Sequence, residues 1–384
     1  MSRNLALVLL GDCMLGRIVD ESLTALPRQL SGVWGDTLPL LQGGLADAAA
    51  GEEQLVAANL ECAVTAEEGK DEERAFNFKL HPSNLPALKA ARIDFVSLAN
   101  NHCLDYKQAG LAETQLVLAS AGIAFAGVGR AAEAARPAIL EQGGLRLAFF
   151  SYADHFPVWA ATDQRSGINY IDPEDYSPAA LHQQLVAAKE AGADLTVVFI
   201  HWGPNWRWRP FKAIQRLARD FVDAGADIVF GHSAHHIQGI QVYRGAPIIY
   251  SAGAFVDDYR LDEGYRNDLS FLFCCHIAEG RPAWLELVPT HIVHTWQQPG
   301  ERPPYLSQVH LARGSNAAWL HSRIRELCKP FGTEVEDAGG SRLRIPLQGT
   351  AGMAAGEGSK TAAGGGSAAA GGGLLSKMLG MLRV

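Results

Sequence analysis

Five short apolar runs in this chain each stop at a polar side chain, and this repeat most constrains how the chain can fold. The run at residues 94–99 ends in two amides, an imidazole and a carboxylate, which are Asn100, Asn101, His102 and Asp105. The other four runs lead to Asp12, Glu61, His201 and His232. Runs of this length, rich in Val, Phe and Leu and followed by helical periodicity, are typical of buried strands in an α/β sheet.

Ligands of open α/β sheets gather at the carboxyl ends of the strands, which is where these polar residues are expected. Carboxylate, amide and imidazole groups are suited to one or two divalent ions such as manganese, iron or zinc. A single histidine at a strand end, such as His201, is more often structural than a metal ligand. Five such coincidences in one chain favour a metal site instead.

The composition is that of a globular protein and argues against nucleic acid as a partner. The chain has 384 residues, of which 48% are hydrophobic and 19% are charged, with a formal net charge of -8 and a pI near 5.9. An acidic chain without a long Lys/Arg block is poorly suited to binding a phosphate backbone.

The cysteine pattern and the apolar segments predict a cytoplasmic location. The six cysteines have no spacing typical of a zinc knuckle or a disulfide framework, which favours a reducing compartment. Three of them, Cys13, Cys62 and Cys103, directly follow candidate site residues. They are either buried fillers beneath the site or soft, redox-sensitive groups within it. Residues 1–10 are too short for a signal peptide, and no run reaches the ~20 apolar residues of a membrane helix.

The pattern of elements predicts four segments along the chain. Residues 1–296 form the main domain, in which the strands expected between residues 237 and 289 suggest an antiparallel second sheet. Residues 297–348 are expected to form a small C-terminal α+β unit, and residues 349–373 are a Gly/Ala/Ser linker. Residues 374–384 form an amphipathic tail that packs on its own domain, docks to a protein partner or lies on a membrane surface.

Taken together, these motifs resemble the capsule and poly-γ-glutamate biosynthesis family CapA, a branch of the calcineurin-like metallophosphoesterase superfamily. The matching segments are Gly11–Arg17, Asn59–Glu61, Ala99–Asp105, His201–Gly203 and Gly231–Gln238. The resemblance implies a four-layer α/β/β/α metallophosphoesterase-like sandwich. It also implies a metal-dependent hydrolase acting on a phosphoester or on a γ-glutamyl or cell-envelope polymer.

A two-metal site needs a bridging anionic oxygen and further oxygen and imidazole ligands on each ion. We predict Glu61 as the bridge. The remaining ligands divide between the two ions as Asp12 and His235 on one and Asn101, His201 and His232 on the other. His236 is an alternative to His235, and the family spacing favours His235.

His102, adjacent to the ligand Asn101, is predicted to be the general acid for the leaving group. Asp105 is expected to orient its imidazole. Further residues are predicted to contact an anionic small-molecule or polymer substrate. Arg17 is expected either to contact an anion or to form a structural salt bridge. The run from Trp202 to Arg209 forms either a substrate wall or packing at the sheet rim. The predicted substrate contacts are Arg17, Asn59, Trp202 and Arg207.

Two departures from the family pattern favour a rival function, that of a non-catalytic metal-binding assembly or polymer-binding subunit. The superfamily usually has a histidine two places after the first Asp, where this chain has Met14. The family usually has Asn at the position of Ala254. The pair His102 and Asp105 favours the enzyme.

Overall fold

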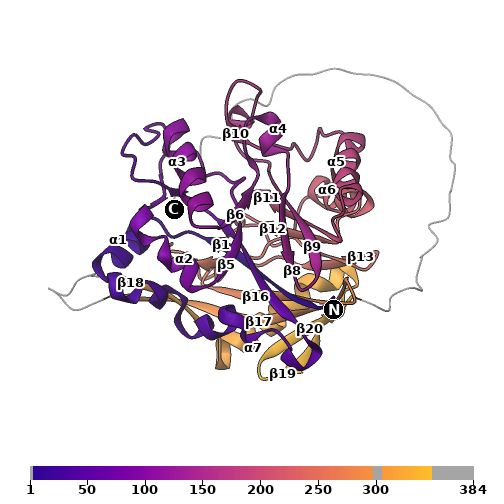
Figure 1. Cartoon of the computed structure of the whole chain (residues 1–384). Helices are drawn as coiled ribbons and strands as arrows, with labels where there is room; N and C mark the ends of the chain where they lie inside the picture. Colours follow the sequence, from indigo (N-terminus) through magenta and orange to yellow (C-terminus); the bar gives the residue numbers. More distant parts are fainter. Residues whose placement is uncertain (1–2, 297–304, 348–384) are drawn as a thin grey trace, which may run out of the picture. The chain divides into compact units, whose positions relative to one another are not determined.

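Two β-sheets, each covered on its outer face by helices, make up the part of the chain that the computed structural model describes, residues 3–296 and 305–347 (Figure 1). The ten-stranded sheet has the order β19-β20-β17-β16-β1-β2-β5-β6, with β15 added beside β1 and β18 beside β17. Its strands are β1 (Leu5–Cys13), β2 (Glu53–Leu60), β5 (Ile93–Ser97), β6 (Ala124–Ala126), β15 (Ala254–Val256), β16 (Leu269–Ala278), β17 (Arg281–Trp296), β18 (Tyr305–Leu311), β19 (Glu336–Gly339) and β20 (Arg342–Pro346).

The six-stranded sheet has the order β13-β14-β12-β11-β9-β8. Its strands are β8 (Ala138–Gln142), β9 (Leu145–Ala153), β11 (Leu195–His201), β12 (Ile228–His232), β13 (Ile240–Tyr243) and β14 (Ala246–Ile249). Two small sheets pair β3 (Ala63–Val64) with β4 (Lys79–Leu80) and β7 (Val128–Gly129) with β10 (Gly167–Ile168).

The two large sheets pack face to face through one apolar core. Alternate residues of β1 divide between its two faces, since successive side chains of a strand point in opposite directions. Leu5, Leu7 and Leu9 join Phe149 and Phe230 of the other sheet in the core between the sheets. Because both faces of β1 are covered, the whole strand is buried, which explains its continuous apolar sequence.

Helices complete the outer layers. Figure 1 shows α5 and α6 side by side, and they pack on β11 and β12. The apolar residues of β1 that face away from the core between the sheets, such as Val8 and Leu10, contact the other helical layer. The α-helices are α1 (Arg17–Ala25), α2 (Pro86–Ala90), α3 (Lys107–Ser120), α4 (Ala131–Ala134), α5 (Pro178–Glu190), α6 (Lys212–Asp223) and α7 (Gly314–Cys328). Shorter helical turns are Pro27–Thr37, Leu40–Gly44, Ala48–Ala50, Pro82–Asn84, Pro157–Trp159 and Lys329–Phe331. The predicted four-layer α/β/β/α sandwich is therefore confirmed.

One strand prediction is wrong. The strands between residues 237 and 289 do not form a separate antiparallel sheet. Strands β13 and β14 join the six-stranded sheet, where β14 runs parallel to β12. Strands β16 and β17 join the ten-stranded sheet, where β16 pairs antiparallel with β1.

The C-terminal segment predicted as a small α+β unit continues the ten-stranded sheet. Strands β18 and β20 both pair with β17, and Leu320 of α7 lies in the core between the sheets. The described residues, 3–296 and 305–347, accordingly group as one compact unit. The predicted linker at 349–373 and tail at 374–384 lie outside the described residues. In the part of the chain that the structure describes, no helix has both the length and the hydrophobicity needed to cross a bilayer.

Candidate metal centre

The predicted metal ligands leave the two sheets at the carboxyl ends of their parallel strands. Asp12 lies near the end of β1, and Glu61 directly follows β2. His201 and His232 are the last residues of β11 and β12, and the strand register pairs them with each other. Residues that are far apart in the sequence thus meet because four parallel strands end at the same edge of the sandwich.

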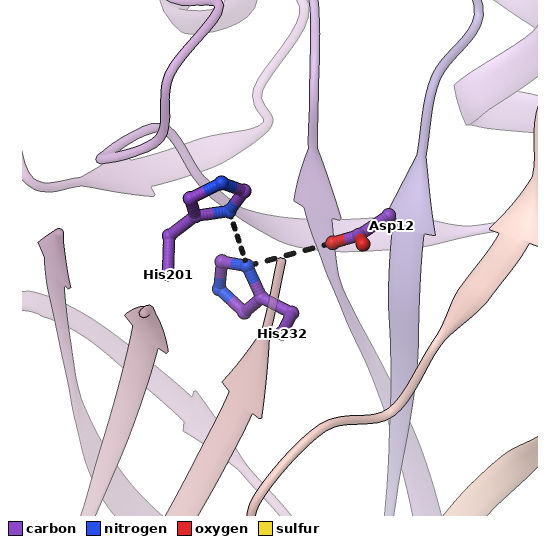
Figure 2. Close-up of side chains that lie close together, drawn as sticks. All are labelled: Asp12, His201 and His232. Carbon is purple, nitrogen blue, oxygen red and sulfur yellow. Dashed lines mark hydrogen bonds and ion pairs between the residues drawn. The ribbon is translucent and has the colours of Figure 1, made fainter. Parts of the chain in front are cut away.

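The first group of possible ligands is Asp12, His201 and His232 (Figure 2). Each of the three residues offers one atom, and these atoms lie within 4.8 Å of one another. The Nδ1 atoms of His201 and His232 are 3.0 Å apart, and Nδ1 of His232 is 3.5 Å from Oδ1 of Asp12. All three side chains are buried, so a cation bound here would be shielded from water.

The second group contains Asp12, Glu61 and His235, again with one possible ligand atom each within 4.8 Å of the others. His235 lies in the turn after β12, and its Nδ1 is 3.5 Å from Oδ2 of Asp12. Asp12 belongs to both groups through its two oxygens. Asp12 is thus common to both groups, and the role of Glu61 as the bridge stays a prediction.

Several buried polar atoms of the centre have no hydrogen-bond partner among the described residues. These atoms are Oε1 of Glu61, Oδ1 of Asn101, Nε2 of His232 and Nδ1 of His235. A buried polar atom without a partner is costly, and such atoms usually have a bound ion or water as their partner. All four are lone-pair donors of the types that bind a divalent ion, so the residues present fit a metal centre.

The pKa values of the residues in the centre also fit a metal site. Burial lowers the pKa of His201 well below its usual value, and burial also lowers the pKa of His232 to about 4. Both imidazoles are therefore neutral near pH 7, which is the form that binds metals. Burial and the neighbouring charge of Asp12 raise the pKa of Glu61 well above its usual value. A cation between these carboxylates would remove their repulsion and favour the ionised form of Glu61.

Burial acts to raise the pKa of Asp12, but the neighbouring side chains of His235, His232 and Asn59 outweigh that effect. The pKa of Asp12 is lowered as a result. The residue common to both groups is therefore ionised near pH 7, as a metal ligand must be.

The predicted pair of His102 and Asp105 lies beside this centre. Nδ1 of His102 is 2.7 Å from Oδ2 of Asp105, and Nε2 of His102 is 4.0 Å from Oε1 of Glu61. The backbone N–H of Phe78 donates to the same Asp105 oxygen at 2.7 Å, and Nε of Arg74 lies 3.0 Å from the other. Asp105 is thus held from three sides, which fixes the His102 ring with one nitrogen toward the ligands.

Asn59 has a different position from the one predicted. It is fully buried, and its amide donates to Asp12 at 2.7 Å and to Glu61 at 3.4 Å. Its own carbonyl oxygen accepts from Asn100, which was not predicted as a site residue. Asn59 therefore orients the two carboxylates, and its full burial gives its predicted role as a substrate contact no support.

Trp202 also lies in the interior, which gives its predicted role as a substrate contact no support. The side chain is 3% exposed, packs in the core under α5 and α6, and donates its indole N–H to the backbone oxygen of Tyr250 at 2.8 Å. Arg207 is exposed and lies over the ring of Phe211 at 4.2 Å. The aromatic residue of this run that reaches the centre is Trp206, whose ring lies 6.3 Å from that of His235.

Of the two alternatives for Arg17, the structure shows the salt bridge. Its guanidinium pairs with Asp258, with Nε 3.1 Å from one carboxylate oxygen, and lies over the rings of Phe78 and Tyr259.

The structure also distinguishes between His235 and His236 as a ligand and between the two interpretations of the cysteines. His235, not His236, joins the ligand group with Asp12. The His236 ring packs instead against Trp206 and Tyr265, with centroids 6.1 and 4.5 Å away. All six cysteines are buried and free, and burial raises the pKa of Cys62 and of Cys103 to about 12. These thiols are core fillers, and no cysteine joins a ligand group among the described residues.

Sequence reasoning missed three ionisable residues near the centre. Arg74 pairs with Asp105, and the ring of His155 lies 5.0 Å from that of His201. Asp154 holds His155 through Nδ1 at 2.5 Å and accepts from the backbone N–H of Gly203 at 2.8 Å. One signal was available for Asp154 and His155, since they directly follow the buried strand β9 as the other site residues follow theirs.

Comparisons with known proteins show which proteins this chain is similar to. The family described as "Bacterial capsule synthesis protein PGA_cap" matches residues 6–259, which include both ligand groups. The "Probable polyglutamine synthesis accessory protein" of Mycobacterium tuberculosis is 33% identical over 320 residues, covering 81% of this chain and 80% of that protein. The "Capsule biosynthesis protein CapA" of Bacillus anthracis is 29% identical, covering 76% and 68%. Among solved structures, a 5'-nucleotidase from Candida albicans aligns with a TM-score of 0.40 and 9% identity, covering 87% of this chain and 58% of that one.

Proposed function

Because this chain belongs to the bacterial capsule synthesis family PGA_cap, we propose that it is a metal-dependent hydrolase in capsule or poly-γ-glutamate biosynthesis. Its substrate would be a phosphoester or a γ-glutamyl or other cell-envelope polymer. One observation carries the proposal. Two buried ligand groups share Asp12, and the imidazole of His102 faces one of them at 4.0 Å from Glu61.

The residues that would hold one or two divalent ions are Asp12, Glu61, Asn101, His201, His232 and His235. Manganese, iron or zinc suits this mixture of oxygen and imidazole ligands. When bound, such ions would polarise the scissile phosphoryl or carbonyl group and activate the attacking water.

The chain's own groups would position the reactants and move the proton. His102 would donate a proton from Nε2 to the leaving group, because this nitrogen faces the ligand Glu61. Asp105 would accept the Nδ1–H of the doubly protonated ring, stabilise the imidazolium that donates from Nε2, and hold the ring in this orientation, since the two groups are 2.7 Å apart. Asn59 would keep the carboxylates of Asp12 and Glu61 in place.

The proposal is tested by metal analysis and by hydrolysis of a generic aryl phosphate. Protein purified without chelator should contain a divalent metal, and His102→Ala should lower turnover about a hundredfold or more. His182→Ala, at an exposed position on α5, is the matched control and should keep the wild-type rate. Bound metal with equal and negligible turnover in the wild type and His102→Ala would reject the hydrolase.

That last outcome would select a second candidate, a non-catalytic metal-binding subunit of a synthesis or export complex. Two observations favour it. Met14 stands where the wider superfamily has a ligand, and its side chain lies in the apolar core. Ala254, paired with Asp12 in the strand register, offers no amide to the centre. The description of the mycobacterial relative as an accessory protein is compatible with such a role.

For location, we propose that the domain works in the cytoplasm and that residues 374–384 contact a protein partner or a membrane surface. The apolar and basic residues of this segment support the proposal.

A further inference from the structure

Arg74 is a guanidinium close to the metal centre whose hydrogen-bonding capacity is largely unused. Its side chain is 13% exposed, and its Nε is 3.0 Å from Oδ1 of Asp105. Among the described residues no hydrogen-bond acceptor reaches Nη1, which is buried. An arginine presents five N–H donors, so a pairing through Nε leaves the buried Nη1 in need of an acceptor.

Two aromatic rings hold the guanidinium in place. Its central carbon lies 4.6 Å from the ring centroid of Phe156 and 4.7 Å from that of Trp159. Both rings belong to the segment after β9, in which Phe156 has a positive φ of 52°. Stacking of this kind covers the face of a guanidinium and leaves its edge for hydrogen bonds. The Phe156 side chain is itself 39% exposed, which places the pair at the surface.

Asp105 divides its two carboxylate oxygens between His102 and Arg74. One carboxylate oxygen faces Nδ1 of His102 at 2.7 Å, and the other faces Nε of Arg74 at 3.0 Å. Asp105 is the only carboxylate of the described residues for which a salt bridge to Arg74 is found. Beside the imidazole that the proposed function makes the proton donor, Arg74 therefore keeps an N–H donor, Nη1, without an acceptor among the described residues.

We propose that Arg74, stacked between Phe156 and Trp159, is a specificity-determining residue that binds an anionic group on the leaving-group side of the substrate. The inference rests on the proposed function, since His102 defines that side. A carboxylate or phosphate near the scissile bond can accept two parallel N–H bonds from the guanidinium. The substrate class is thus narrowed to compounds whose leaving group carries a negative charge of its own.

A direct binding measurement tests the proposed role of Arg74 and does not require turnover. Calorimetry would compare phenylphosphonate with 4-carboxyphenylphosphonate on the manganese-loaded full chain. The two ligands share the phosphonate for the metal centre and differ in one carboxylate. We expect the carboxylated ligand to bind roughly tenfold more tightly to the wild type, as a charge-assisted contact allows. Arg74→Gln should abolish this preference, while Arg74→Lys should keep part of it.

Arg244→Gln is the matched control. Arg244 also pairs with a carboxylate, Asp223, and lies over an aromatic ring, that of Tyr243, but it is located in the turn between β13 and β14. This variant should keep the tenfold preference. Because both ligands are measured on each variant, a general loss of metal or folding lowers both affinities and leaves their ratio unchanged.

The outcomes separate this inference from the proposed function. Tight binding of both phosphonates with no preference in the wild type, or a preference that survives Arg74→Gln, would overturn the role of Arg74 alone. Failure of both phosphonates to bind would overturn the phosphoester form of the proposed function and the subsite with it. A preference that depends on Arg74, in a protein that does not hydrolyse the corresponding aryl phosphates, would support the subsite and reject the hydrolase.

Discussion

Acid should destabilise the metal-free protein partly through protonation of His236. A single substitution at this position measures how much of the loss of stability comes from this ring. Burial lowers the pKa of His236 to about 4, from an ordinary value of 6.5. The folded protein therefore resists protonation of this ring, while the unfolded chain takes up the proton readily. Stability contributed by the neutral ring is complete above pH 6.5 and is lost as the pH falls from 6.5 towards 4. Because the unfolded chain binds this proton more readily, the free energy of unfolding falls by about 2 kcal/mol between pH 7 and pH 5.

The measurement is the free energy of unfolding from urea titrations with a chelator present, at pH 7 and at pH 5. Several groups of the centre titrate in this range, and the raised pKa of Glu61 acts in the opposite direction. The quantity to compare is therefore the pH-dependent loss in the wild type minus the loss in His236→Gln. We expect this difference to be about 2 kcal/mol, because Gln cannot titrate. His182→Gln, at an exposed position, should show the wild-type loss.

The neighbouring substitution His235→Gln makes the experiment specific. Manganese at about 100 times its Kd should stabilise a site-competent protein by about 2.7 kcal/mol. His236→Gln should keep this metal-dependent gain, because its ring lies against Trp206 and Tyr265. His235→Gln should lose most of it. If His236→Gln lost as much stability as the wild type between pH 7 and pH 5, the assignment of a buried, neutral ring would be refuted.

Two further predictions concern the backbone at Asp12 and the C-terminal tail. A Cβ at Gly11 would lie 2.0 Å from the backbone oxygen of Gly253, so Gly11→Ala should destabilise the fold by roughly 1–3 kcal/mol and abolish the stabilisation by manganese. Gly69→Ala, with no atom within 4 Å of its Cβ, should change neither, and an unaltered thermal unfolding curve for Gly11→Ala would contradict the geometry. Removal of Leu374 to Val384 should leave aryl phosphate hydrolysis unchanged and alter membrane or partner association. An unchanged fractionation profile would count against an anchoring role.

The site residues that could be predicted from the sequence are those that follow buried strands. A short apolar run ending in Asp, Glu or His places that residue at the carboxyl edge whatever the strand order is. Asp12, His201 and His232 were found by this rule, and the structure brings them together. The pairing of Arg74 with Asp105 was not predictable in the same way, because a contact between two loops depends on packing that no local pattern encodes.

The errors also have physical causes. Trp202 directly follows His201, and neighbouring residues of a strand point to opposite faces. With His201 facing the centre, the period of two directs Trp202 into the helical layer, where the structure places it. The prediction of the sheet that contains β16 and β17 was wrong for another reason. Alternation along a strand shows which residues are buried but not which neighbouring strand it joins, and β16 pairs with β1 across more than 250 residues of sequence.

The position of Asp12 links the site to the packing of the whole sandwich. Asp12 belongs to the ten-stranded sheet, whereas His201 and His232 belong to the six-stranded sheet. The register of β1 shifts on both sides of Asp12, between Leu10 and Asp12 toward β2 and between Asp12 and Cys13 toward β15.

A register shift of this kind changes the direction of a side chain that would otherwise point as the alternation along the strand requires. Here it lets Asp12 reach His232 of the opposite sheet at 3.5 Å. A metal held by this group would therefore connect the two sheets, so its binding should depend on the apolar contacts between them as well as on the ligands. The packing of the two sheets therefore brings residues from positions 12 to 235 into one centre without any long motif in the sequence.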